Sequence, residues 1–97
     1  MATGSAEYFT GLQGAARILT RRGKYDEALK VLDLVDVEKL GGSWGGSMLF
    51  TRAQTLDAAG RTADALKLYR TVLSNKTAHE AHRKAADEAI QQIENQQ

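Results

Sequence analysis

Two histidines, His79 and His82, come closest to the residue types and spacing of a metal site. They stand three positions apart in the sequence His-Glu-Ala-His, whereas histidine pairs that bind zinc on one helix face stand four apart. Zinc sites use three or four side-chain ligands, and no third candidate is close in the sequence. We therefore expect no metal site, with one histidine half-packed against the protein and the other in water.

The glycine-rich segment 41–47, with sequence GGSWGGS, is the part of the chain to test for phosphate binding. A Walker loop needs a lysine followed by serine or threonine after its last glycine, and a strand before it. Here Gly46 is followed by Ser47 and Met48, and the preceding segment is predicted to be helical. We expect no nucleotide or other cofactor, and we interpret the segment as an irregular turn between helices.

The remaining residue types used in catalysis form no recognisable constellation. The chain has no cysteine, which excludes thiolate nucleophiles, disulfides and thiolate metal sites. The carboxylate pairs Asp26-Glu27 and Asp87-Glu88 are neighbours in sequence, and neighbours point in different directions on a helix. We therefore predict that the protein is not an enzyme.

The overall charge gives no reason to expect a nucleic-acid partner. Thirteen basic and twelve acidic residues leave a formal charge of +1, so no overall field attracts a polyanion. The basic cluster at residues 17–24 lacks an aromatic stacking platform and is offset by Asp26 and Glu27.

Membrane association is not expected from the sequence either. No apolar run approaches the roughly 18 residues of a membrane span, and the N-terminal residues lack the basic and apolar regions of a secretory signal. We therefore expect a soluble, cytoplasmic protein.

Apolar residues at helical spacing predict an all-α fold of five helices. Their expected positions are near residues 5–22, 25–40, 46–59, 62–74 and 78–95. Gly23 and Gly60 are expected to end helices in the left-handed conformation, and Asn75 to end the fourth in the same way. Thr77 and Glu80 have the spacing of a capping box at the start of the last helix. The 97 residues form a single domain.

Two stretches of the chain, 15–35 and 49–73, share one pattern, which predicts an internal repeat. Alignment on Gly23 and Gly60 brings small and apolar residues into register. The matched pairs are Ala16 with Ala53, Leu19 with Leu56, Ala28 with Ala65, Leu29 with Leu66, and Val35 with Val72. Gly11 and Gly14, inside the first helix, are expected to allow close approach of a neighbouring helix.

These matched alanines, leucines and glycines resemble the tetratricopeptide repeat (TPR), a helical hairpin of about 34 residues. The resemblance implies a right-handed stack of antiparallel helical hairpins. Repeat one would cover about residues 9–42, repeat two about 46–79, and a capping helix about 78–95. The two glycines stand 60 − 23 = 37 positions apart, and we place the three extra residues in the glycine-rich turn. Arg52 stands where the family has a small or apolar residue.

The resemblance implies a non-enzymatic scaffold that binds a peptide or a helix of another protein in a concave groove. It places this groove along Gln13, Arg17 and Arg21 of the first helix, Phe50, Gln54 and Asp57 of the third, and Lys84, or its neighbour Arg83, of the last. An alternative function is a structural or self-assembly module, in which the chain forms a homo-oligomer or is part of a longer repeat protein.

Phe50 is the one aromatic residue of this expected groove. It follows Leu49 and so lies about 100° around the helix from the predicted buried stripe. Its alignment partner is Gln13, so the repeat does not demand an apolar ring at this position. We therefore expect Phe50 to be exposed on the groove face as a binding anchor.

Overall fold

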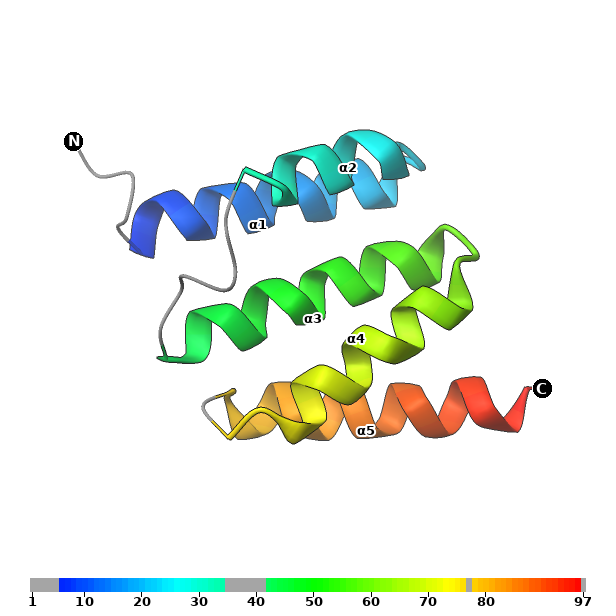
Figure 1. The fold of residues 1–97 in the computed structure, drawn as a ribbon. Helices are drawn as coiled ribbons and strands as arrows, with labels where there is room; N and C mark the ends of the chain where they lie inside the picture. The colour runs from blue at the N-terminus through cyan, green and yellow to red at the C-terminus, as the bar shows by residue number, and fades with distance from the viewer. Residues whose placement is uncertain (1–5, 35–41, 77, 97) are drawn as a thin grey trace.

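The computed structural model describes residues 6–34, 42–76 and 78–96 of the chain, and within them the side-chain surroundings of 8–34 and 45 onward (Figure 1). Five α-helices and no strand make up these ranges. They are α1 (Ala6–Arg21), α2 (Tyr25–Leu32), α3 (Gly42–Ala58), α4 (Thr62–Ser74) and α5 (Glu80–Asn95). The all-α fold of five helices predicted from hydrophobic periodicity is confirmed.

Helix α3 is the central element of the molecule, because it contacts each of the other four helices. Figure 1 shows α1 and α2 lying side by side along one side of α3, with α4 and α5 on the other side. Helix α2 turns back along α1, and α4 turns back from the end of α3. The remaining contact joins α4 to α5.

Both helix pairs are closed by the same glycine turn. Gly23 and Gly60 have φ angles of 77° and 82°, the only positive values among the described residues. In the first turn the amide of Lys24 donates to the Leu19 carbonyl at 2.9 Å, and the amide of Gly23 to Thr20 at 3.1 Å. This pair of hydrogen bonds defines a Schellman motif, which needs a left-handed residue that glycine adopts without steric cost.

The second turn repeats these bonds at positions 37 residues later (60 − 23). Arg61 donates to Leu56 at 2.9 Å and Gly60 to Asp57 at 3.0 Å. The alignment on the two glycines, which was drawn from residue types, therefore also holds for backbone geometry.

The predicted turn at 41–47 is wrong, because α3 begins at Gly42 and includes the rest of the glycine-rich segment. A methyl group at Gly46 would stand 2.6 Å from the Cβ of Ala78 and 3.1 Å from its Cα, so only glycine permits this approach of the chain. Tertiary packing thus overrides the low helix propensity of glycine. Gly41 lies outside the described residues.

Two further helix boundaries differ from their predictions, whereas α4 ends at Ser74 as predicted but without the expected left-handed stop. Helix α2 ends at Leu32, and residues 35–40, which were expected to continue it, lie outside the described residues. Asn75 is extended, with φ −80° and ψ 110°, so it is not a left-handed stop. Helix α5 begins at Glu80 after His79, whose side chain makes no capping hydrogen bond. Thr77 lies outside the described residues, so the capping box remains a prediction.

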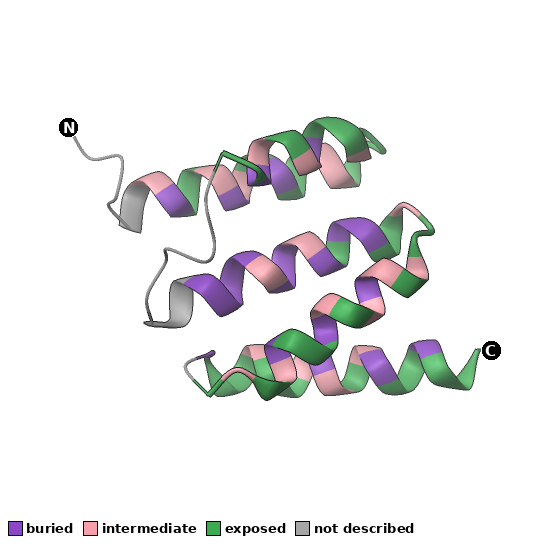
Figure 2. Cartoon of the chain, viewed as in Figure 1, coloured by how far each residue is buried: buried purple, intermediate pink, exposed green. Residues whose placement is uncertain are grey.

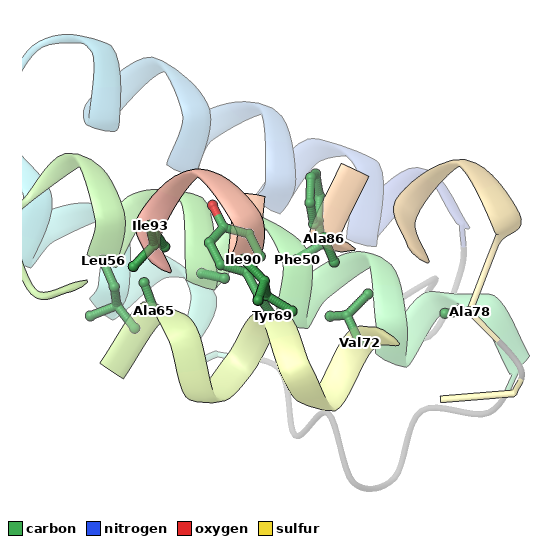
Figure 3. Packing of buried hydrophobic residues seen from close by; sticks show 10 residues of the cluster. Phe50, Leu56, Ala65, Tyr69, Val72, Ala78, Ala86, Ile90 and Ile93 are labelled. Atoms are coloured by element: carbon green, nitrogen blue, oxygen red, sulfur yellow. The ribbon is translucent and has the colours of Figure 1, made fainter. Parts of the chain in front are cut away.

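The buried residues form two clusters, and α3 contributes to both (Figure 2). The smaller cluster joins α1, α2 and the start of α3, and consists of Phe9, Ala16, Ala28, Leu32 and Met48. The larger one joins α3, α4, α5 and the segment before α5 (Figure 3), and consists of Phe50, Ala53, Leu56, Ala65, Tyr69, Val72, Ala78, Ala86, Ile90 and Ile93. The four aligned alanines at 16, 53, 28 and 65 are fully buried, as their repeat positions predict.

Replacing Gly60 with valine tests the glycine turn. A residue with a Cβ in the left-handed region costs roughly 1–2 kcal/mol, and a β-branched one lies at the upper end. We expect Gly60→Val to lower the free energy of unfolding by about this amount in urea titrations.

The matched control is Gly11→Ala, in the exposed middle of α1, where a methyl group would meet no atom within 4 Å. It should raise stability by about 0.5–1 kcal/mol, because alanine is the better helix former. A Gly60→Val protein with the parental urea midpoint would contradict the left-handed turn.

Candidate functional site

A row of polar side chains joins α1 to α3. The amide nitrogen Nε2 of Gln13 donates to Ser47 Oγ at 2.6 Å and to Thr51 Oγ1 at 3.1 Å. Further along the same contact, the hydroxyls of Thr20 and Thr55 are 2.9 Å apart. Gln13, Thr51 and Thr55 are buried, so these bonds are protected from competing water. We call these five residues (Gln13, Thr20, Ser47, Thr51 and Thr55) the polar seam.

The hydroxyls of the polar seam also bond to their own helices. Thr20 donates to the Ala16 carbonyl at 2.8 Å, and Thr55 to the Thr51 carbonyl at 3.1 Å. Each hydroxyl has only one hydrogen, so the contact between Thr20 and Thr55 forms only when one of them releases its carbonyl. The seam therefore holds two alternative hydrogen arrangements with the same heavy-atom positions.

A cleft of about 340 Å³ opens beside the polar seam, between α1 and α3. Its lining residues are Arg17, Thr20, Arg21, Thr51, Gln54 and Thr55. The two arginines stand one helical turn apart on α1, and Gln54 faces them from α3. Arg17, Arg21 and Gln54 are exposed, whereas the threonines are buried or half-buried. The cleft thus has a floor of hydroxyl groups and a rim of two guanidinium groups and an amide.

The structure brings three of the seven residues expected in the groove to this cleft: Arg17, Arg21 and Gln54. Gln13 is buried beside it in the polar seam, where its amide is already hydrogen-bonded. Asp57 and Lys84 are exposed on α3 and α5 but do not line the cleft.

Phe50 does not have the exposed position expected of it. Its side chain is 8 % exposed and belongs to the larger cluster. Its ring packs edge-on against Tyr69 of α4, with centroids 5.9 Å apart, and against His82 of α5 at 5.2 Å. Helix α5 covers a side of α3 that the two-helix repeat pattern leaves open, and this is why the expectation was wrong. Phe50 cannot act as a binding anchor without leaving the core.

His82 is one of two titratable groups beside Phe50 whose pKa is shifted by the surroundings. Its Nδ1 atom is buried without a hydrogen-bond partner among the described atoms. Burial lowers the pKa of His82, and the charges of His79 and Arg17 lower it further. The neighbouring His79 is exposed, with ring centroids 5.9 Å apart. Within the described residues, no group of three or more histidine, aspartate or glutamate side chains could hold a metal ion.

Tyr69 shows the same influence of burial. Desolvation by burial and, to a smaller extent, the negative charge of Asp57 raise the pKa of its phenol to about 12. The hydroxyl therefore stays protonated at neutral pH, and Asp57 lies close enough to this part of the core to affect it.

A second cleft, of about 430 Å³, lies between α2, α3 and α4. Its lining combines leucines with charged side chains: Leu29, Asp33, Arg52, Leu56, Arg61, Asp64, Lys67 and Leu68. Ion pairs join Arg52 to Asp33 and Arg61 to Asp64 across its rim. Arg52, unusual for its repeat position, thus ties α3 to the end of α2.

Sequence reasoning missed the threonines of the polar seam, although their spacing was visible. Ser47, Thr51 and Thr55 recur every four residues, which places three hydroxyls on one face of α3. Because hydroxyl groups are usually exposed, this face was not recognised as a helix contact.

The part of the chain that the structure describes is an all-α arrangement of five helices, with a polar, arginine-lined recess between α1 and α3. Comparison of the chain with protein-family models, with curated proteins and with solved structures gave no match. None of the helices in the described ranges has the length and apolar character needed to cross a membrane.

Replacing Phe50 with alanine should destabilise the protein strongly. Loss of a buried phenylalanine typically costs about 3–5 kcal/mol, a large part of the stability of a domain of this size. We expect a large fall in the thermal midpoint, followed by circular dichroism. The matched control is Gln54→Ala, one turn along α3 and exposed, which should melt like the parent. An unchanged midpoint for Phe50→Ala would contradict the packing of α3 against α5.

Stability should also depend on the protonation of His82. Since its folded pKa is lower than the usual value of 6.5, the unfolded chain binds more protons between the two values. The free energy of unfolding should therefore fall as the pH is lowered below about 6.5. In His82→Leu this loss should be reduced, as measured by urea titrations at about pH 7.5 and 5.5. Identical pH dependence in both proteins would show that His82 does not contribute.

Proposed function

We propose that the chain is a non-enzymatic protein-interaction scaffold that binds a peptide or a helix in the cleft between α1 and α3. One observation carries this proposal. Arg17, Arg21 and Gln54, expected in a binding groove on the strength of the repeat pattern, line the same cleft. Hydroxyl, amide and guanidinium groups offer the hydrogen bonds by which a polypeptide is recognised.

A TPR-like arrangement of two repeats and a capping helix is part of this proposal. It is supported by the two identical glycine turns and by the four buried alanines at equivalent positions. In such an arrangement α1, α3 and α5 would be the inner helices that border a concave groove. The contacts of α3 with both α1 and α5 agree with this assignment.

Filling the cleft tests the proposed function without assuming a partner. Peptides are first selected from a random displayed library on the immobilised protein. An indole at position 54 would occupy the recess, so Gln54→Trp should reduce the affinity of the selected peptides by about tenfold or more.

Lys30→Trp is the matched control, because it places the same ring on the exposed side of α2. It should bind the peptides like the parent, and both variants should keep the parental thermal midpoint. Equal affinities of the Gln54→Trp protein and the parent would locate binding elsewhere and contradict the proposal.

Self-assembly is a second candidate, favoured by an exposed face of α1. Ile18 is 50 % exposed, and the expected close approach of a helix to Gly11 and Gly14 is wrong, since a methyl group there would meet no atom within 4 Å. In the repeat alignment Gly11, Gly14 and Ile18 correspond to Met48, Thr51 and Thr55. These three residues of α3 are buried where α3 packs against α1. The exposed face of α1 is thus equivalent to one that α3 uses for packing.

The oligomeric state separates the two candidates. Size-exclusion chromatography with light scattering should give a monomer at all concentrations if the cleft is the functional site. A dimer that strengthens with concentration, and that Ile18→Glu abolishes, would favour self-assembly.

A further inference from the structure

Within the described ranges, the two arginines of the cleft between α1 and α3 have no acidic partner. The ion pairs found among the described residues join Arg52 to Asp33, Arg61 to Asp64 and Arg70 to Glu94, and none of them includes Arg17 or Arg21. The second cleft differs in this respect, because two ion pairs lie on its rim. The guanidinium groups of Arg17 and Arg21 are thus available to a ligand in the cleft beside the polar seam.

No carboxylate is among the described residues that line this cleft. His82 of α5 does not add to this charge at neutral pH, because burial, together with the charges of His79 and Arg17, lowers its pKa. The two arginines alone therefore make the cleft locally basic, on a chain whose formal charge is only +1.

The spacing of the arginines sets a condition on the ligand. Arg17 and Arg21 are four residues apart on α1, which places their Cα atoms about 6 Å apart along the helix axis. In an extended peptide, side chains two residues apart point to the same side at about 6.6–6.8 Å. The spacing of the two arginines along α1 thus closely matches the spacing of alternate side chains in an extended peptide. Adjacent side chains of such a peptide point to opposite sides.

We propose, on the basis of the scaffold function above, that the cleft binds an extended acidic peptide whose carboxylates alternate with other residues, in the pattern acidic-x-acidic. The carboxylate of each acidic residue pairs with one guanidinium group, which can donate two parallel hydrogen bonds to it. Gln54 on the opposite wall carries both a donor and an acceptor, so it can bond to a peptide group between the two acidic residues.

A peptide suits this site better than a single small anion. The two guanidinium groups lie on the exposed rim of a recess of about 340 Å³, not around one buried point. An exposed ion pair contributes little by itself, so useful affinity requires several contacts made together along the cleft.

The test uses fluorescein-labelled peptides and fluorescence anisotropy with the full chain. One peptide contains Glu-Ala-Glu within a serine and glycine background, a second contains Ala-Glu-Glu with the same composition, and a third contains Gln-Ala-Gln. We expect the first to bind about tenfold more tightly than the third and severalfold more tightly than the second. The preference should weaken with added salt.

Two double variants with the same loss of charge locate the binding. Arg17→Gln with Arg21→Gln should weaken binding of the Glu-Ala-Glu peptide by about tenfold or more. Arg22→Gln with Lys24→Gln removes two charges outside the cleft and should leave the affinity within about twofold of the parent. All four positions are exposed, so both variants should keep the parental thermal midpoint.

The proposal is overturned if the Glu-Ala-Glu and Gln-Ala-Gln peptides bind equally or not at all, or if the two double variants lose equal affinity. It is also overturned if the Ala-Glu-Glu peptide binds as tightly as the first, or if one phosphoserine in place of the two glutamates binds more tightly. Selected library peptides without alternating acidic residues could bind the parent and lose affinity for the Gln54→Trp protein. That result would support the scaffold function and reject the preference for acidic peptides.

Discussion

The contact between α1 and α3 determines where every part of the candidate site lies. Together with the contact between α2 and α3, it joins the first helix pair to the rest of the molecule, and one side of it is made of hydrogen bonds. Such bonds add only about 0.5–1.5 kcal/mol each to stability, but a buried donor that loses its partner costs more. The polar seam therefore adds less to stability than an apolar contact of the same size, and it fixes the register of α1 on α3. Gln13 meets Ser47 and Thr51 together only in this register, which also brings Arg17 opposite Gln54.

Much of the fold could be predicted from the sequence, because helical periodicity and glycine chemistry are local properties. The two glycine turns follow from the steric freedom of one residue. The burial of Ala16 and Ala28 could be predicted because small residues recur at the equivalent positions of the second repeat. The wrong predictions concern residues whose conformation or burial is determined by contacts with distant parts of the chain. Gly46 is helical because Ala78 packs against it, and Phe50 is buried because α5 covers it. Periodicity identifies one buried face of a helix, but it does not count the neighbours that cover the others.

The candidate site follows the same division. Arg17, Arg21 and Gln54 could be located from the repeat, since equivalent positions of α1 and α3 face the same side. The positions of Lys84 and Asp57 could not be located in this way, because they depend on how the helices pack. Lys84 follows the direction of α5, and Asp57 lies near enough to the buried Tyr69 to affect its pKa. The threonine floor of the cleft was recognised only in the structure, where hydroxyls that resemble surface residues meet across a helix contact.

The division of the core into two clusters has a consequence for how the molecule folds and opens. The larger cluster is built within α3, α4 and α5, which follow one another in the chain, so its contacts close short loops and can form early. Helices α1 and α2 then dock on an existing surface, through a small apolar cluster and a set of hydrogen bonds. A pair attached in this way is the natural unit of subglobal unfolding, with amide protons that exchange through partial opening before the whole chain unfolds. Because one wall of the arginine-lined cleft belongs to α1, each such opening removes that wall while α3 and α5 stay folded.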